Sequence, residues 1–79
     1  MNERIHVYAR STGGRVEPLQ FIRNNRLYCI REVMTYQTER LPHKVLHRLK
    51  VGVLPEGTCE LLFDLKSGQW LLTEAALPS

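Results

Sequence analysis

The chain has 79 residues, the size of one small domain, and we treat residues 1–79 as a single unit. It contains no run of about 18 apolar residues that could cross a membrane, no glycine-rich phosphate loop and no serine-centred nucleophile elbow. Its net charge of +3 is modest for a protein that binds nucleic acids. We therefore expect no membrane contact and no nucleotide-dependent or serine-hydrolase chemistry.

The first strand is predicted at residues 5–10, which alternate in polarity and end at a turn cluster, residues 11–14. Residues 16–23 form the second strand, with Leu19 and Phe21 expected on one face. Pro18 has no N–H to donate, so its part of the strand should lie at an edge or at the strand start.

Asn24 and Asn25 then predict a tight turn, since asparagine tolerates left-handed backbone conformations. The next strand covers residues 26–37, and its apolar residues change phase before Val33. A bulge near Arg31 and Glu32 explains the change and would help the sheet to curl. Residues 38–43 are expected to form a connecting loop.

Residues 44–53 fit two structures. A strand places Val45, His47 and Leu49 on one face, whereas a helix would begin at Pro42 and bury Val45, Leu46 and Leu49. We favour the strand, because the sequence Val-Gly-Val at residues 51–53 is poor helix material.

The last two strands form a hairpin, residues 59–72, after a turn at residues 55–57. Asp64 can cap the hairpin loop through its side-chain oxygen, and Gly68 can take the positive φ that closes it. Six strands joined mostly by hairpins would expose edges and an apolar face in an open sheet. We therefore predict an all-β fold, a small six-stranded, SH3-like, partly open β-barrel. The predicted core consists of Val7, Leu19, Phe21, Tyr28, Ile30, Val33, Leu49, Val51, Leu61, Phe63 and Trp70.

A set of turn residues and core aromatics resembles a known family. The matching pattern is Pro18-x-x-Phe21, then Arg26-x-Tyr28-x-Ile30-x-x-Val33, then Glu60-Leu61-x-Phe63-Asp64-x-x-x-Gly68-x-Trp70-x-Leu72. It is similar to a family of small uncharacterised bacterial β-barrel domains of unknown function, some of which occur near genes for translesion DNA polymerases. The resemblance covers most of the chain and implies the fold, but it carries no known activity. The chain departs from the pattern at Tyr36, where a tryptophan is common.

The N-terminus and the cysteines indicate the compartment. Residues 1–6 are charged and lack the apolar stretch of a secretion signal. Cys29 and Cys59 each lie in an apolar run, where free cysteine behaves as a small hydrophobe. We expect a cytoplasmic protein with two buried thiols.

Few residues could support catalysis or bind a metal. His43 and His47 have the spacing of a zinc pair on a helix, but a strand orients them less favourably and no third ligand is evident. The other candidates are His6, the two cysteines, Glu32 and Asp64. The cysteines are more simply buried packing residues, Asp64 a turn cap, and Glu32 an exposed partner of an arginine or a bulge residue. We therefore expect no enzyme activity, no metal and no cofactor.

Two binding functions stay open. Leucines whose phase points away from the core suggest that a second copy or a larger protein covers one sheet surface, as in a protein-interaction or structural module. The set that includes such residues is Leu41, Leu46, Leu62, Leu71 and Leu72.

The alternative is a nucleic-acid-binding accessory module with a basic and aromatic face. Ten of the eleven Lys and Arg residues precede residue 51, which gives the chain a charge dipole. On such a face the bases would stack on tyrosine and the phosphates would pair with guanidinium groups. The candidate residues are Arg10, Arg26, Arg31, Arg48, Lys50 and Tyr28.

Overall fold

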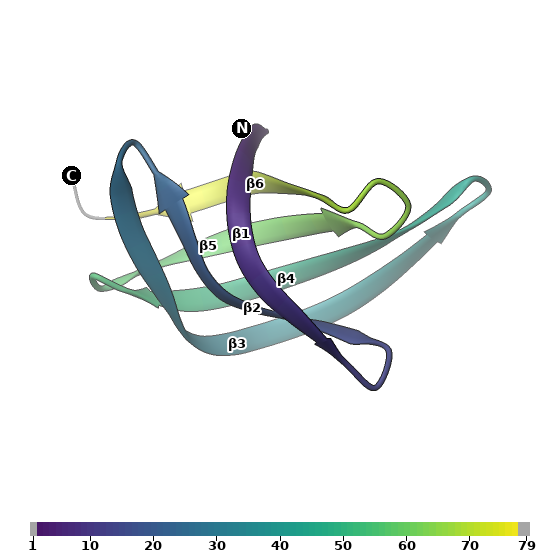
Figure 1. Ribbon diagram of the computed structural model, residues 1–79, viewed down its shortest axis with the longest axis horizontal. Helices are drawn as coiled ribbons and strands as arrows, with labels where there is room; N and C mark the ends of the chain where they lie inside the picture. Colours follow the sequence, from purple (N-terminus) through teal and green to yellow (C-terminus); the bar gives the residue numbers. More distant parts are fainter. Residues whose placement is uncertain (1, 78–79) are drawn as a thin grey trace.

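The computed structural model describes residues 2–77 and consists of antiparallel strands wound into one barrel (Figure 1). Successive strands are neighbours in the sheet, and β1 also pairs with β6, so that the sheet closes on itself. The strands are β1 (Glu3–Thr12), β2 (Arg15–Arg23), β3 (Arg26–Leu41), β4 (Lys44–Leu54), β5 (Gly57–Asp64) and β6 (Gln69–Ala76). The expected all-β, six-stranded barrel is confirmed.

Closure of the barrel depends on a short contact between the first and the last strand. β1 pairs with β6 at three positions, Glu3 with Leu72, Arg4 with Leu71 and Ile5 with Trp70. The sheet is therefore closed where the sequence led us to expect a partly open one. Closing removes the two outermost edges, which an open six-stranded sheet would leave unprotected.

The expected turns are present at their predicted positions. Asn24 and Asn25 have φ values of 52° and 63°, the left-handed pair that a two-residue hairpin requires. In the β5–β6 loop the Lys66 N–H donates to Oδ1 of Asp64 at 2.9 Å. The Gly68 N–H donates to the Asp64 carbonyl at 2.8 Å, and Gly68 has a φ of +73°.

Residues 44–53 belong to strand β4, as we predicted, and not to a helix. The prediction of a connecting loop at residues 38–43 was wrong, because β3 continues to Leu41. Register explains the difference: Leu41 pairs with Lys44, so that only Pro42 and His43 remain to turn the chain. The added strand residues find ladder partners on β4, which a reading of local residues could not foresee.

Bulges change the inward-facing set on β2 and β3. The bulge expected near Arg31 is confirmed by the step from Ile30 to Glu32 in the β3–β4 register, and a second one follows at Met34. A further bulge at Leu19 lies between Tyr8 and Ala9 of the partner strand β1. Each bulge reverses the alternation of faces.

Two residues predicted for the core are exposed, for two different reasons. Leu19 is 42% exposed because it is the extra residue of its bulge, and Pro18 before it is buried instead. Val33 is 39% exposed because it lies where β3 has already separated from β2. The prediction for these two side chains was wrong.

The barrel interior is formed by side chains from all six strands. At its centre the rings of Phe21 and Tyr28 stack with centroids 5.1 Å apart. The predicted core residues that are buried are Phe21, Tyr28, Leu49, Val51, Leu61 and Trp70, and those partly buried against them are Val7, Ile30 and Phe63. Further members of the buried cluster, which we did not place in the core, are Val16, Val53, Cys59 and Leu72.

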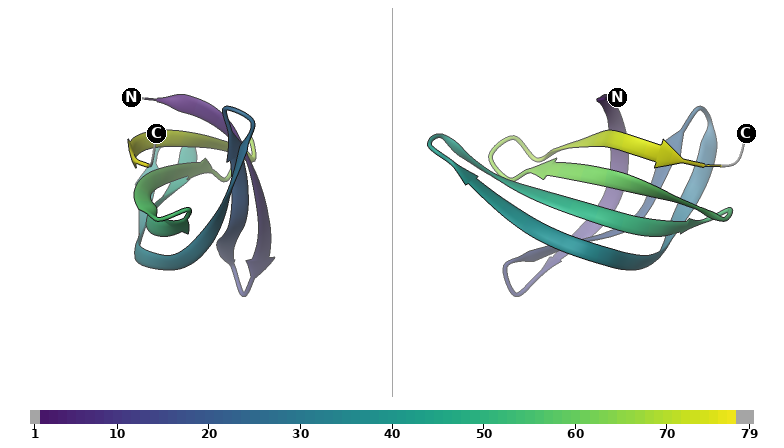
Figure 2. Two further views of the ribbon diagram at one scale, coloured as in Figure 1. Left: turned by 90° about the vertical axis from the view of Figure 1, so that its left-hand side faces the viewer. Right: turned by 180° about the vertical axis from the view of Figure 1, so that it is seen from behind.

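Strands β2 and β3 pair over only four positions, Gln20–Arg23 with Cys29–Arg26. Beyond them β2 continues along β1 and β3 continues along β4, so that the two strands separate. Figure 1 shows β1 and β2 running steeply across the other strands, and the view from behind in Figure 2 shows the β3–β4 hairpin extending past them. This separation opens one end of the barrel. It also meets the expectation for Pro18, which lies in the part of β2 that pairs only with β1.

We predict that Gly57→Ala destabilises the protein by about 1–3 kcal/mol, because an added methyl group would overpack against backbone. A Cβ at Gly57 would lie 2.6 Å from the Ala76 carbonyl oxygen and 3.2 Å from the Leu77 Cα. Urea unfolding measures the change. Gly52→Ala is the control, since its Cβ would meet the flexible Arg31 and Glu32 side chains at 3.3 Å. Equal losses for the two variants would contradict this account.

Candidate protein interaction surface

The six residues predicted to bind nucleic acid do not share one face. Tyr28 is 5% exposed and stacks on Phe21 in the core, so it offers no ring to a base. Arg26 lies at the β2–β3 turn, and Lys50 lies on β4 opposite Thr35. Arg10 lies near the C-terminal end of β1, opposite Glu17 on β2.

Three of these arginines pair with carboxylates of the same chain. Arg10 Nε lies 3.0 Å from Glu17 Oε2, and Arg48 joins Glu39 and Glu60 at 2.9 Å each. Arg31 lies between Glu32 at 3.5 Å and Glu56 at 3.6 Å. The Thr73 hydroxyl donates to Glu60 as well, and this bond together with Arg48 lowers the pKa of the Glu60 carboxyl. These guanidinium groups are thus neutralised locally.

The outward-facing side chains of β1 to β4 form two rows across the sheet. The first row is His6, Ile22 and Leu27, which are directly opposite one another in register. The second row is Tyr8, Gln20, Cys29 and Leu54. We call these seven residues the outer apolar face.

The outer apolar face exposes large side chains to solvent. Leu54 is 51% exposed, Leu27 47%, Tyr8 44% and Ile22 41%. The rings of His6 and Tyr8 meet edge to face at 5.0 Å. Arg10 and Arg31, which are both ion-paired, lie two residues beyond Tyr8 and Cys29 of the second row and form part of a polar rim. An apolar centre with a charged rim is the usual anatomy of a protein interface.

Cys29 belongs to the outer apolar face and is exposed, so the expectation that both thiols are buried was wrong for Cys29. It pairs with Gln20, one position after the inward-facing Tyr28, and the alternation of the strand therefore turns it outward. Cys59 is buried as expected, and burial raises the pKa of its thiol to about 11.

The five leucines expected to include a covering surface lie in three different environments. Leu62 and Leu71 face each other across β5 and β6 and line a small cavity of about 90 Å³ with Leu46, which is 8% exposed. Leu41 is 44% exposed beside the β3–β4 turn, whereas Leu72 is fully buried inside the barrel. These leucines thus form no single covering surface.

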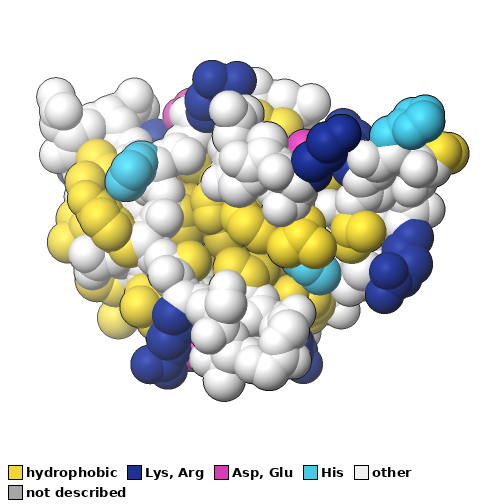
Figure 3. All heavy atoms as spheres, turned by 45° about the vertical axis from the view of Figure 1, so that its right-hand side comes forward, with side chains coloured by type: hydrophobic (Ala, Val, Ile, Leu, Met, Phe, Trp, Pro, Cys, Tyr) yellow, Lys and Arg dark blue, Asp and Glu magenta, His cyan; other side chains and the backbone are white. Residues whose placement is uncertain are grey.

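The open end of the barrel holds a second feature, a row of aromatic rings on its inner wall. Tyr36 lies 5.3 Å from His47, His47 lies 6.3 Å from Phe63, and Phe63 lies 4.7 Å from Trp70, measured between ring centroids. Figure 3 shows hydrophobic side chains gathered in a hollow of the surface at this end.

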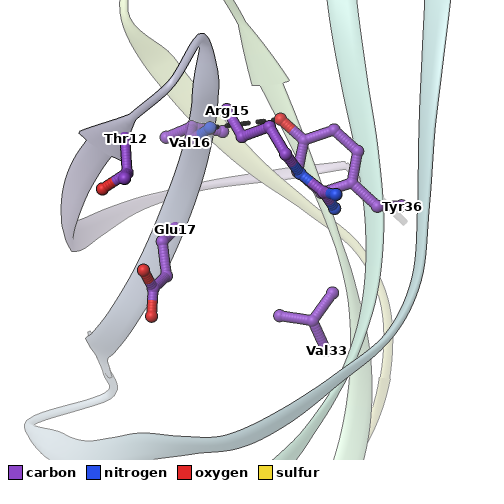
Figure 4. A pocket seen from close by; sticks show the side chains of 6 residues that line it. All are labelled: Thr12, Arg15, Val16, Glu17, Val33 and Tyr36. Carbon is purple, nitrogen blue, oxygen red and sulfur yellow. Dashed lines mark hydrogen bonds between the residues drawn. The ribbon is translucent and has the colours of Figure 1, made fainter.

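A pocket of about 340 Å³ lies where β2 and β3 separate (Figure 4). Its lining is Thr12, Arg15, Val16, Glu17, Val33 and Tyr36. Tyr36 reaches across from β3, and its hydroxyl accepts a hydrogen bond from the Val16 N–H at 3.2 Å. The Arg15 guanidinium lies 4.2 Å from the centre of the Tyr36 ring, a cation–π contact. Tyr36 therefore ties the separated strands together.

The candidate catalytic groups lie apart from one another. His6 is on the outer apolar face, His43 is in the β3–β4 turn, and His47 is 7% exposed with Nδ1 at 3.2 Å from the Thr38 hydroxyl. Asp64 caps the β5–β6 loop, and Glu32 pairs with Arg31. Among residues 2–77 no three His, Cys, Asp or Glu side chains gather in a way that could hold a metal ion.

Comparison with protein family models, with curated proteins and with solved structures finds no match to the chain. Within the described residues there is no helix that could span a membrane.

Sequence reasoning missed Ile22, Leu27 and Leu54 as surface candidates. A signal for the first two was present: a two-residue turn at residues 24–25 sets Phe21 opposite Tyr28, so that Ile22 and Leu27 must share the other face. Leu54 gave no such signal, because its position opposite Cys29 depends on the two bulges in β3.

We predict that acid destabilises the fold through His47. Burial lowers the pKa of its imidazole below the ordinary value of 6.5, and the nearby charges of Arg40 and Arg15 lower it further. The unfolded chain therefore binds the proton more readily, so stability is full above about pH 6.5 and falls as the pH drops toward the folded-state pKa. Thermal unfolding of wild type and His47→Gln between pH 7.5 and 5 measures the effect. The variant should show the shallower dependence, and equal slopes would contradict it.

We predict that the two thiols react differently with a thiol reagent at pH 8. Cys29 should react in the folded protein, and Cys59 only after unfolding, because the thiolate is the reactive form and burial suppresses it. Titration with Ellman's reagent should give one equivalent before and two after denaturant is added. Cys29→Ser should give none in the folded state, and a fast reaction of that variant would contradict the assignment.

Proposed function

We propose that the domain is a non-enzymatic protein-interaction module that docks onto a larger protein through the outer apolar face. The observation that best supports this proposal is that two adjacent rows expose Tyr8, Ile22, Leu27 and Leu54 and contain no Asp, Glu, Lys or Arg. Large apolar side chains at the centre of such a face provide binding energy when a partner removes them from water.

The rim indicates the chemistry of the partner. Arg26 follows the hairpin turn directly and adjoins Leu27, and no ion pair holds it among the described residues. The chain carries a net charge of +3. A partner with an apolar patch and carboxylates at its border fits this surface, because opposite rim charges favour encounter and orientation.

The setting that we propose for this module is the cytoplasm of a bacterium, and its architecture is that of an SH3-like barrel of the uncharacterised family described above. Two cysteines without a disulfide support a reducing compartment. The resembling residues Phe21, Tyr28 and Trp70 lie in the core, which supports a likeness of fold.

Nucleic-acid binding is the second candidate function. Its site would be the open end of the barrel and not the set of residues that the sequence suggested. Arg15 and Arg40 both lie close enough to His47 to lower the pKa of its imidazole, so two cations flank the aromatic row at the open end. A single strand could use such a combination of charge and rings. The tyrosine and histidine rings there are partly covered by Arg15 and by the barrel wall, which favours the protein-docking proposal.

The docking proposal is tested by site-specific photo-crosslinking in bacterial cells. A photoreactive phenylalanine analogue at Leu27 or Leu54 should give a crosslink to one other protein, which mass spectrometry identifies. The same analogue at Leu65, which is 55% exposed in the β5–β6 loop, is the matched control and should give none. With the purified partner, Leu27→Glu should weaken binding by about tenfold or more, and Leu65→Glu should not.

Three results would count against the proposal. Equal crosslinks from Leu65 would show that the contact is unspecific, and unchanged affinity of Leu27→Glu would remove the outer apolar face from binding. Salt-sensitive binding of a labelled single-stranded oligonucleotide that Arg15→Ala abolishes, with no protein crosslink at Leu27, would favour the nucleic-acid role instead.

A further inference from the structure

The strand β3 has one edge without a partner along its second half. Among the described residues β3 pairs with β2 only up to Cys29, and from Thr35 to Leu41 it pairs with β4 alone. Neither a bulge nor a proline interrupts this stretch, since the register runs evenly from Thr35 opposite Lys50 to Leu41 opposite Lys44. Such an edge offers backbone donors and acceptors to another strand.

The ladder type shows which backbone groups point outward. Leu41 and Lys44 flank a two-residue turn and so form a hydrogen-bonded pair, which makes the next pair, Arg40 with Val45, the other type. The Val45 carbonyl accepts a bond from the Leu65 N–H at 3.0 Å, and it therefore points away from β3. The N–H and C=O groups of Tyr36, Thr38 and Arg40 accordingly face the edge.

We infer that this edge pairs with the same edge of a second copy, antiparallel and centred on Thr38. Two copies related by a two-fold axis must align residues whose backbone groups both face the edge. Centring on Thr38 aligns Thr38 with Thr38 and Tyr36 with Arg40 in both directions, which gives about six backbone hydrogen bonds. Centring one residue to either side aligns fewer of these residues.

The side chains favour the same register. On the outer side it sets Gln37 opposite Glu39 of the second copy, an amide that can donate to a carboxylate. A shift of the centre to residue 39 would set the two Glu39 carboxylates directly opposite each other, which is unfavourable. The register centred on Thr38 places no like charges opposite one another.

The neighbouring pocket lies at the level that the turn of the second copy would reach. In this register Pro42 and His43 of the second copy reach the level of residues 33–34 of the first. The pocket of about 340 Å³ lined by Val33 and Tyr36 lies at that level. The outer apolar face uses other residues of β3 than this interface does. The dimer would therefore leave the outer apolar face available to another partner.

The experiment compares two variants at one position by sedimentation velocity over a dilution series. Thr38→Pro removes the outward N–H but no bond to β4, because proline is tolerated where its nitrogen faces away from the ladder. Thr38→Ala keeps the N–H and loses the same hydroxyl contact to His47. We expect the wild type and Thr38→Ala to be dimeric. Thr38→Pro should raise the dissociation constant of the dimer at least about tenfold, because it disturbs the centre of an interface with about six backbone hydrogen bonds.

A second pair of variants tests the register without touching the backbone. Gln37→Glu would face Glu39 twice in the dimer and should raise the dissociation constant by about three- to tenfold, whereas Gln37→Lys should lower it. These variants remain informative if Thr38→Pro fails to fold, which circular dichroism would show.

Either of two results would overturn the inference. A wild-type chain that stays monomeric at millimolar concentration has no such interface. A dimer that Leu27→Glu dissociates while Gln37→Glu leaves it intact would place self-association on the outer apolar face. A failed crosslink at Leu27 with an intact Thr38-centred dimer would instead count against the docking proposal alone.

Discussion

The register of the β2–β3 hairpin determines which side chains of these two strands face the core and which face solvent on either side of their turn. The turn at Asn24 and Asn25 needs left-handed backbone at both positions, and it sets Phe21 opposite Tyr28. That pair stacks at the centre of the core. Because faces alternate along a strand, the same register turns Ile22 and Leu27 outward together. One turn therefore contributes to both the stability of the core and the surface through which we propose that the protein acts.

The second constraint is that β2 and β3 cannot stay paired along their whole length. β1 and β2 cross the other strands steeply, and the bulges at Arg31 and Met34 bend β3 along β4 (Figure 1). Tyr36 spans the resulting gap by accepting the Val16 N–H, which a tryptophan could not do because its indole nitrogen only donates. The separation thus creates the pocket and the accessible edge of β3, at the cost of ladder bonds that the tyrosine partly replaces.

The charges of the protein are used mainly within the chain. Arg48 joins strands β3, β4 and β5 through Glu39 and Glu60, and Arg23 makes a bidentate contact with Glu3 near the point of closure. The basic residues that look like a binding face in the sequence are distributed over several strands, and carboxylates neutralise three of them, Arg10, Arg31 and Arg48. The apolar rows remain as the larger surface feature, and the two proposed contacts, one to another protein and one to a second copy, use different parts of the barrel.

The sequence by itself determined the strands, the turns, the bulge at Arg31 and most of the core, since these follow from alternation and from the backbone preferences of Asn, Gly and Pro. It also contained the outward pairing of Ile22 and Leu27, through the two-residue turn. Only the tertiary structure decided the extension of β3 to Leu41, the bulges at Leu19 and Met34, and the exposure of Val33. The physical reason is that these features depend on which residue of a neighbouring strand lies opposite, and a cross-strand register is set by the whole closed sheet rather than by the local residues.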